Sequence, residues 1–291
     1  MADLKDLTVQ SLFDIQGWVA VVTGGGTGLG LITAKALAAN GAKVYVTGRR
    51  AEKLKDAETT DPASGGSIVG VQMDVTDKDS IKATVKQISE KEQHVNLLVN
   101  NAGVSSVNYG PSGPPKGSVE DISETMFNNQ TFEDWDWIYK VNVASYYFTS
   151  AAFLPLLCAA RDKAGYPEAG NILNISSISG ITKESQNGQF SYNASKAAAI
   201  SLTEQLAVDL KRPGLEVRVN TLAPGYFPSE MTPIDAEAGK EKEHFMTKWG
   251  IPFGRAGQPR DYAQAVLNFA VNQYVTGSTL VIDGAWLLAH A

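Results

Sequence analysis

The stretch Trp18-Val19-Ala20-Val21-Val22-Thr23-Gly24-Gly25-Gly26-Thr27-Gly28-Leu29-Gly30 joins an apolar, β-rich run to a cluster of glycines. Residues 31–41 follow with helical periodicity and end in Asn-Gly, a helix stop signal. A glycine turn between a strand and a helix lets the backbone approach a pyrophosphate and points the helix N–H groups at it. The spacing of the glycines is not the G-x-G-x-x-G of the main dinucleotide fingerprint, and a glycine cluster alone is also compatible with a simple turn. The place of this cluster after the first strand favours a nucleotide site.

The rest of the sequence alternates between strand and helix patterns. Apolar runs predict strands at 43–47, 67–73, 95–99, 170–177, 215–222 and 278–282, and periodic segments predict helices at 78–92, 131–160 and 259–271. Strands that alternate with helices in this way predict a doubly wound α/β fold with a parallel sheet. We expect one domain over residues 1–291.

One segment interrupts the alternation. Residues 104–130 are predicted to be an inserted loop, because their first half is rich in Gly, Pro and Ser. Long loops in compact domains are often functional. A domain boundary is the weaker interpretation, since the strand and helix pattern resumes afterwards. A second loop, 226–258, follows the strand at 215–222 and includes a charged helical segment at 235–249.

Composition and charge argue against several classes of protein. With 43% hydrophobic and 19% charged residues, the chain has the composition of a globular protein with a large core. A net charge of −6 argues against a nucleic-acid partner, which requires a basic surface. The single Cys158 excludes an internal disulfide, and His94, His244 and His290 lack the spacing of metal ligands, so no metal is expected. We expect a cytoplasmic protein without a membrane partner, because the N-terminus lacks a secretory core and the apolar runs are predicted to be too short to span a bilayer.

Tyr192 and Lys196 lie at the head of a long alanine-rich helical run, in Ser191-Tyr192-Asn193-Ala194-Ser195-Lys196. Residues four apart share one face of a helix. Ionising a tyrosine of pKa about 10 at pH 7 costs roughly 4 kcal/mol. An ammonium about 4 Å away, at an effective dielectric constant near 20, supplies roughly the same energy. The pair therefore indicates a proton donor and acceptor that works near neutral pH, although Tyr-x-x-x-Lys alone also matches an exposed helical pair without function.

Two arginines, and no acidic residue, follow the second predicted strand. In adenine-dinucleotide folds, an acid at this position accepts from the ribose 2′-OH, whereas an arginine accommodates a 2′-phosphate. Arg49 and Arg50 therefore favour NADP(H) over NAD(H), and the alternative is a solvated helix start. Asp74 follows the third strand, where it either faces the cofactor crevice or caps the next helix.

Two further polar residues have positions that suggest a role. Asn142 lies within the apolar stretch 138–143, so a buried amide there must find hydrogen-bond partners. Ser177 ends the fifth predicted strand, and ligands bind at the carboxyl ends of strands in open α/β sheets. It lacks a G-x-S-x-G elbow and a histidine partner, so it is not expected to be a hydrolase nucleophile.

Taken together, these motifs resemble those of the short-chain dehydrogenase/reductase family. They run in family order over about residues 17–285: Thr23, Gly24, Gly28, Gly30, Asp74, Asn100 to Gly103, Asn142, Ser177, Tyr192, Lys196, Pro224-Gly225, Val275 to Gly277 and Asp283-Gly284. The resemblance implies a Rossmann fold with seven parallel strands, usually in a homodimer or homotetramer. Together with Arg49 and Arg50, it predicts an NADPH-dependent enzyme that reduces a ketone or aldehyde to an alcohol, reversibly.

The resemblance implies a division of labour among four catalytic residues. Tyr192 exchanges a proton with the substrate oxygen, and Lys196 lowers the tyrosine pKa and bonds the nicotinamide ribose. Ser177 orients the carbonyl, and Asn142 holds the water that leads from Lys196 to solvent. The positions that match the family's contacts to NADPH or NADP⁺ are Gly24, Thr27, Gly28, Leu29, Arg49, Asp74, Val75, Asn101, Ala102, Gly103, Tyr192, Lys196, Pro224, Gly225, Phe227 and Ser229.

The sequence departs from the family pattern in three places. The separation of Ser177 from Tyr192 is about two residues longer than is typical of the family, so Ser179 is a rival for the serine role. The segment 104–130 is longer than usual, and Ala285 stands where glycine is common. The segment Ala223–Thr232 resembles fungal members of the family and a bacterial β-ketoacyl reductase of glycolipid synthesis.

The small-molecule substrate is expected to be mainly apolar or aromatic. The loops after the fourth and sixth strands open on the same carboxyl edge as Ser177 and Tyr192, so they are predicted to cover the nicotinamide pocket. Tyr109, Phe127, Tyr226 and Phe227 are the aromatic candidates for its walls. Two alternatives remain open: the first is that residues 104–130 pack against a neighbouring subunit, and the second is that the chain is a non-catalytic NADP-binding sensor or scaffold.

Overall fold

The computed structural model of the protein describes residues 3–229 and 240–290. Its strands form one sheet in the order β3-β4-β2-β1-β5-β6-β7-β8, in which every neighbouring pair is parallel except β3 and β4. The strands are β1 (Val19–Thr23), β2 (Lys43–Gly48), β3 (Thr59–Thr60), β4 (Ser67–Gln72), β5 (Leu97–Asn100), β6 (Asn171–Ile175), β7 (Arg218–Pro224) and β8 (Thr279–Ile282). The predicted doubly wound parallel sheet is confirmed. The strand in addition to the seven predicted ones is the antiparallel β3, whose two residues are too few to show a periodic pattern in the sequence.

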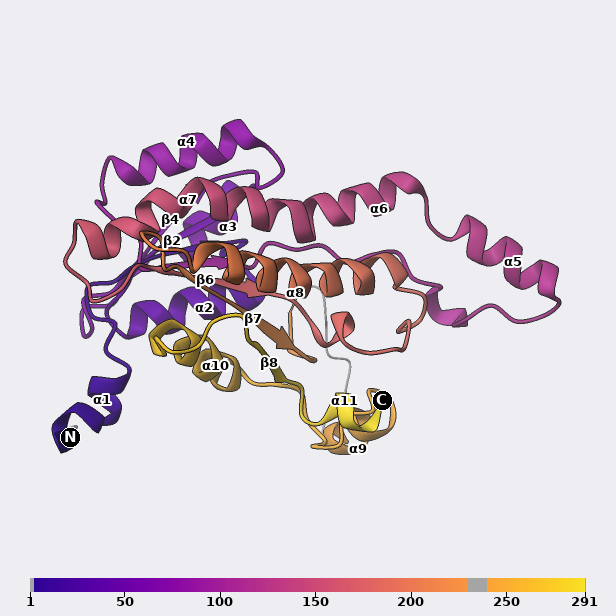
Figure 1. Ribbon diagram of the computed structural model, residues 1–291. Coiled ribbons are helices and arrows are strands. Elements are labelled where there is room, and N and C mark those ends of the chain that lie inside the picture. Colours follow the sequence, from indigo (N-terminus) through magenta and orange to yellow (C-terminus); the bar gives the residue numbers. More distant parts are fainter. Residues whose placement is uncertain (1–2, 230–239, 291) are drawn as a thin grey trace.

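Helices cover both faces of the sheet (Figure 1). One face carries α2 (Gly28–Ala39), α3 (Ala51–Ala57) and α10 (Pro259–Val271), and the other carries α4 (Lys78–Ser89), α7 (Ser145–Asp162) and α8 (Phe190–Leu210). The other helical segments are η1 (Leu4–Leu7), α1 (Val9–Leu12), η2 (Gly110–Ser112), α5 (Val119–Asn128), α6 (Phe132–Tyr139), η3 (Lys140–Ala144), η4 (Ile178–Gly180), α9 (Glu241–Thr247) and α11 (Trp286–Ala289). The described part of the segment predicted at 235–249 contains the helix α9, and residues 230–239, which include the rest of it, lie outside the described residues.

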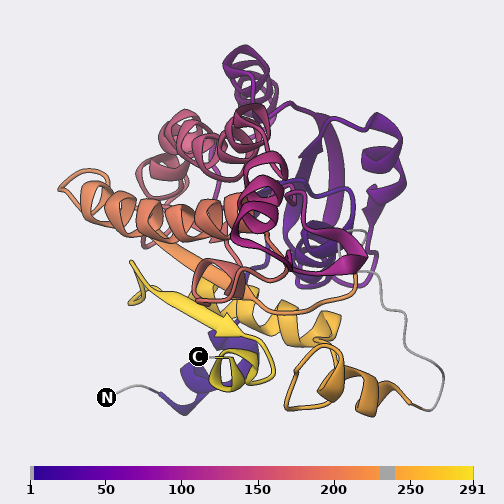
Figure 2. The same ribbon diagram turned by 90° about the vertical axis from the view of Figure 1, so that its right-hand side faces the viewer.

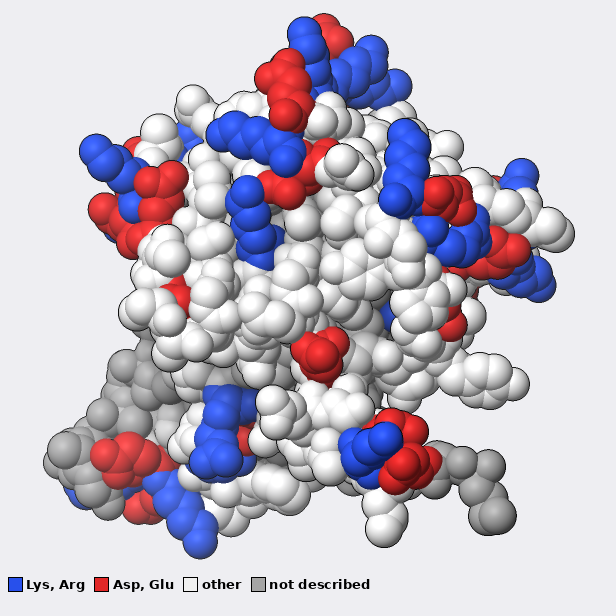
Figure 3. All heavy atoms as spheres, turned by 90° about the vertical axis from the view of Figure 1, so that its left-hand side faces the viewer, with Lys and Arg blue, Asp and Glu red and all other residues white. Residues whose placement is uncertain are grey.

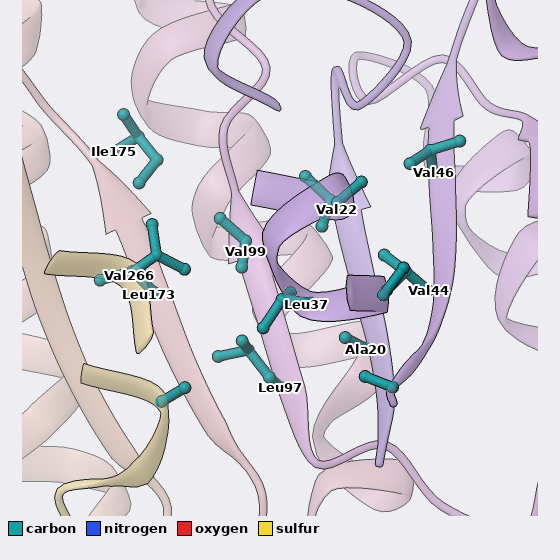
Figure 4. Packing of buried hydrophobic residues seen from close by; sticks show 14 of the residues in the cluster. Ala20, Val22, Leu37, Val44, Val46, Leu97, Val99, Leu173, Ile175 and Val266 are labelled. Atoms are coloured by element: carbon teal, nitrogen blue, oxygen red, sulfur yellow. The ribbon is translucent and has the colours of Figure 1, made fainter. Parts of the chain in front are cut away.

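The two faces of β1 show how the sequence builds two cores. Ala20 and Val22 belong to the cluster under α2 and α10, and Val19 and Val21 belong to the cluster under α4 and α7, because successive side chains in a strand point to opposite faces. Figure 4 shows Ala20 and Val22 packed with Val44, Leu97 and other residues of the first cluster. Full burial of one such side chain contributes about 1.5–3 kcal/mol. A strand that is apolar on both faces is therefore held in the middle of the sheet.

The second half of the predicted inserted loop is a helix. Ser118 caps α5 through a capping box with Asp121, a signal that the loop prediction for 104–130 overlooked. No side chain of α5 is buried, and the helix extends beyond the end of the sheet (Figure 1). In Figure 2, the insertion lies in front of the sheet.

The expectation that no apolar segment has membrane-spanning length is wrong for one helix. The continuous helical run Phe132–Asp162 is long and apolar enough to cross a membrane, with a mean hydropathy of 1.5 over its most apolar window. Half of that window is buried inside the protein, and Tyr146, Phe153 and Leu157 are fully buried against the sheet. Packing in the core therefore accounts for this hydropathy.

The apolar residues that precede β1 are divided between core and surface. Ile15 is buried in the cluster under α2 and α10, whereas Leu12 is 47% exposed. On the face shown in Figure 3, acidic and basic side chains of the described residues are interspersed and form no continuous basic surface.

Candidate active site

A cleft of about 350 Å³ lies at the carboxyl ends of β1, β2, β4, β5 and β6. Thirteen of the predicted site residues line it: Gly24, Thr27, Gly28, Leu29, Arg49, Asp74, Val75, Asn101, Ala102, Gly103, Tyr192, Lys196 and Ser229. Asn142 and Ser177 lie behind the lining and contact residues that form it. Pro224, Gly225 and Phe227 are not in the lining, so their cofactor contacts stay predictions.

The glycine turn forms one wall of the cleft. Gly24 and Gly28 have positive φ angles of 64° and 53°, which only glycine adopts readily. A Cβ on Gly24 would lie 2.9 Å from Cα of Ala102, so the turn packs directly on the segment that follows β5. Asn101 fixes this contact, because its Nδ2 donates to the carbonyls of Thr23 and Gly24 at 3.0 and 3.2 Å.

The N-terminus of α2 opens onto the same wall. Thr27 occupies the N-cap position without a side-chain cap hydrogen bond, and the first turn contains no acidic residue. The first N–H groups of a helix lack intrahelical partners and carry a partial positive charge. The turn and the helix end therefore suit a pyrophosphate group.

One end of the cleft is lined by three cationic side chains. Arg49, Arg50 and Lys53 all line it, and Arg50 Nη2 donates to Thr27 Oγ1 at 3.2 Å. The guanidinium of Arg49 lies 5.5 Å from the ring centroid of Trp137, a cation–π contact. Sequence reasoning missed Lys53 and Trp137. Lys53 follows Arg50 by three residues and so lies on the same side of the chain at the start of α3. Trp137 is distant from Arg49 in sequence and comes close to it only in the folded protein.

Asp74 follows β4, the strand next to β2, and lies at the same end of the cleft as Arg49. Its Oδ1 accepts hydrogen bonds from the backbone N–H and the hydroxyl of Thr76 at 2.9 and 2.7 Å. Burial acts to raise the pKa of Asp74, but these hydrogen bonds, together with the charges of Arg49 and Lys140, leave the pKa below its usual value. Helix α4 is capped instead by Asp77. Asp74 is therefore an ionised group of the cleft rather than a helix cap.

Tyr192 and Lys196 lie at the opposite end, on the first turns of α8. Lys196 Nζ donates to the Ile175 carbonyl at 3.0 Å and lies 5.8 Å from the ring centroid of Tyr192. The Tyr192 hydroxyl shares a hydrogen bond with Ser177, whose Oγ donates to Ser179 Oγ at 3.1 Å. Ser177 therefore contacts the tyrosine, and Ser179 supports it from behind.

Asn142 lies in the π-helical segment η3, close to the lysine. Its Oδ1 accepts from Val104 N–H at 2.9 Å, and its Nδ2 donates to the Val104 carbonyl and to Ser195 Oγ, both at 3.0 Å. The buried amide thus has partners for both of its polar atoms. It joins the segment after β5 to α8, which fixes the wall of the cleft beside Lys196.

Burial dominates the ionisation of the Tyr192 and Lys196 pair. It lowers the pKa of Lys196 to about 8. It also raises the pKa of Tyr192, an effect that the Ser177 hydrogen bond partly offsets. The sequence argument had the ammonium lower the tyrosine pKa. In the structure, Lys196 donates to backbone and to Tyr146 instead, with no hydrogen bond to the Tyr192 hydroxyl among the described contacts.

Replacement of Lys196 by Met is expected to change how stability depends on pH. Between pH 8 and 10.5 the unfolded chain keeps the lysine proton and the folded protein loses it, so the unfolding free energy of the wild type rises with pH in this window. Over this pH window, the unfolding free energy of the wild type is expected to rise by about 3 kcal/mol more than that of Lys196→Met. Urea unfolding of the cofactor-free protein at several pH values measures it, with the exposed Lys211→Met as control. Parallel pH curves for wild type and Lys196→Met would contradict the buried, depressed lysine.

None of the four predicted aromatic wall residues, Tyr109, Phe127, Tyr226 and Phe227, is in the lining of the cleft. Phe127 is 84% exposed on α5, and Phe227 is only 5% exposed in the core, where its ring lies 5.6 Å from that of Tyr262. Phe127 and Phe227 point elsewhere, because Phe127 is on a helix that buries no side chain and Phe227 is packed in the core. Tyr226 packs edge-on against Trp249 at 4.6 Å and shares a hydrogen bond with Gln186, and its closeness to Tyr192 raises the pKa of that residue.

Comparison with known proteins agrees with this geometry. Residues 18–239 match the family model described as short chain dehydrogenase. The chain belongs to the short-chain dehydrogenase family. Its relatives include the short-chain dehydrogenase/reductase VdtF of Byssochlamys spectabilis, which is 36% identical over 98% of this chain and 97% of the relative.

Two bacterial proteins of the family are also similar to the chain. The rhamnolipids biosynthesis 3-oxoacyl-[acyl-carrier-protein] reductase of Pseudomonas aeruginosa is 31% identical over 95% of this chain and 98% of the relative. The solved Pseudomonas aeruginosa RhlG/NADP active-site complex superposes with a TM-score of 0.76 at 28% identity, covering 94% of this chain and 98% of that one. The chain is thus an oxidoreductase of the short-chain dehydrogenase family, whose fold binds nicotinamide cofactors.

Proposed function

We propose that this protein is an NADPH-dependent reductase of a ketone or aldehyde, reversible as an alcohol dehydrogenase. The observation that carries the proposal is that one cleft holds Arg49, Arg50 and Lys53 at one end and Tyr192 and Lys196 at the other. A cofactor that carries a 2′-phosphate on its adenosine and a reactive ring at its far end suits this distribution of charge.

The residues present fit NADPH along the length of the cleft. The glycine turn and the open N-terminus of α2 suit the pyrophosphate, and the arginines suit the 2′-phosphate, since no acid of the described residues competes at the end of β2. NADPH, when bound, supplies the hydride. The solved RhlG complex, which contains NADP, supports this choice of cofactor.

The catalytic end supplies a proton donor and its supports. In the proposed reduction, Tyr192 gives its hydroxyl proton to the substrate oxygen, and Ser177 donates a hydrogen bond to the same oxygen. Lys196 places a cation behind the tyrosine as its proton leaves. Asn142 holds Val104 and Ser195 in place around the lysine.

An apolar or aromatic substrate is favoured by the surroundings of Tyr226. This ring belongs to a cluster with Trp249 and Trp286, and Ile178 and Phe245 are buried in the same cluster. Several of the similar bacterial proteins are 3-oxoacyl-[acyl-carrier-protein] reductases, which supports a β-ketoacyl thioester as one candidate. The proposal retains a cytoplasmic homodimer or homotetramer, in which exposed apolar side chains of α7 and α8, such as Phe148 and Val208, would be covered.

The proposal is tested by following NADPH oxidation against a panel of aromatic ketones, quinones and β-ketoacyl thioesters, with NADH in parallel. We expect turnover of at least one class and a preference for NADPH. Tight NADPH binding without turnover of any carbonyl would support the non-catalytic sensor or scaffold instead.

A further inference from the structure

A turn of uncommon backbone conformation precedes the helix that carries Tyr192. Gln186, Asn187 and Gly188 have φ angles of 50°, 67° and 83°. A left-handed backbone at two successive residues other than glycine persists where surrounding contacts enforce it. Gln189 then caps α8 without a side-chain cap hydrogen bond, and Tyr192 follows Gly188 by four residues. The position of Tyr192 therefore depends on what holds this turn.

The start of the insertion binds the turn through backbone and side chain. Tyr109 N–H donates to the Asn187 carbonyl, and Asn187 Nδ2 donates to the Gly110 carbonyl, both at 3.0 Å. The Tyr109 ring lies on Gly188, where an added Cβ would come within 2.5 Å of a ring carbon. Glycine at 188 is therefore required both for its positive φ and for this contact.

The end of the insertion binds the same turn from a second direction. Gln130 Nε2 donates to the Gly188 carbonyl at 2.9 Å and to the Val107 carbonyl at 3.2 Å. One amide thus joins both ends of the insertion to the turn. Between these ends, α5 buries no side chain, so the contacts of the insertion are concentrated at its base.

We propose that the base of the insertion is a clamp on the turn 186–188, and that Gln130 and Asn187 are positioning residues that hold Tyr192 against Ser177. The inference rests on the proposed function, in which Tyr192 is the proton donor. It assigns the insertion a role in the rate of the chemical step, whereas a loop that only covers substrate would act on KM alone.

The test uses variants that remove one amide each. Gln130→Glu keeps the shape of the side chain but cannot donate to the two carbonyls, and Asn187→Gly keeps a residue that adopts positive φ while removing the amide. We expect kcat to fall about 10- to 100-fold in each, because small displacements of a reacting group have effects of this size. The NADPH dissociation constant should stay unchanged. The matched control is Asn128→Ala, since the Asn128 amide bonds only to the Glu124 carbonyl within α5 among the described contacts.

A second measurement separates the clamp from the proposed function. The titration of Tyr192 is followed by NMR of isotope-labelled tyrosine in the absence of substrate, with its signal assigned by its loss in Tyr192→Phe. We expect the Tyr192 pKa to move upward in both clamp variants, because the Ser177 hydrogen bond that lowers it is loosened, and to stay unchanged in Asn128→Ala. Three results in the clamp variants would contradict the clamp. They are an unchanged pKa of Tyr192, a change in KM without a change in kcat, and a loss of both NADPH affinity and thermal stability. Absence of turnover in the wild type would contradict the proposed function, and the titration would still decide the clamp.

Discussion

Tyr192→Phe is expected to lower kcat by roughly 10²–10⁴-fold, the usual contribution of a positioned general acid or base. The change deletes the hydroxyl that the mechanism uses and keeps the ring that lines the cleft. Ser177 retains its hydrogen bond to Ser179, so no new unpaired serine is created beside the ring. NADPH affinity and the unfolding free energy should therefore change little. Steady-state kinetics and fluorescence titration with NADPH measure the two effects separately.

The matched control is Tyr274→Phe, because Tyr274 is fully exposed and far from any lining residue of the cleft in sequence. It should leave both kcat and NADPH affinity at wild-type values. Turnover of Tyr192→Phe within a few-fold of wild type would show that another group donates the proton, and the proposed mechanism would then be wrong.

The sequence predicted the sheet and the cleft because these depend on short-range patterns. Apolar runs such as Val19–Thr23 are recognisable without any partner, and parallel strands necessarily bring their carboxyl ends to one edge. Residues at those ends, such as Gly24, Asp74 and Asn101, therefore meet in the cleft whatever the details of packing.

Other features could not be predicted because they arise from tertiary contacts. Trp137 lines the cleft through its place on α6, and the sequence gives no indication that its ring meets Arg49. Gln186 and Asn187 are left-handed in a turn that accepts hydrogen bonds from Tyr109 at Asn187 and from Gln130 at Gly188, and both donors are more than 50 residues away along the chain. Burial also reverses the expected order of effects at Tyr192, since removal from water raises its pKa before any neighbour acts.

Replacement of both Arg49 and Arg50 by alanine is expected to remove the preference for NADPH. A charge-assisted hydrogen bond contributes roughly 1.5–3 kcal/mol, and each 1.4 kcal/mol corresponds to a tenfold change in affinity. Loss of two such bonds to a 2′-phosphate should weaken NADPH binding by about 100-fold or more, whereas NADH, which lacks that phosphate, should change by less than about threefold. Isothermal titration of both cofactors measures the difference without any requirement for turnover.

The electrostatic origin of this preference gives the double variant a second signature. Attraction between exposed charges is screened by salt, so the ratio of NADPH to NADH affinity in the wild type should fall as ionic strength rises, and the ratio in the double variant should not. Arg212→Ala is the matched control, because Arg212 is an exposed arginine paired with Asp209 at the end of α8.

A smaller loss of NADPH affinity is expected for Trp137→Leu, which removes the ring beside the Arg49 guanidinium but leaves both charges in place. Equal affinity of the wild type for NADPH and NADH would contradict the role of these arginines and with it the choice of cofactor.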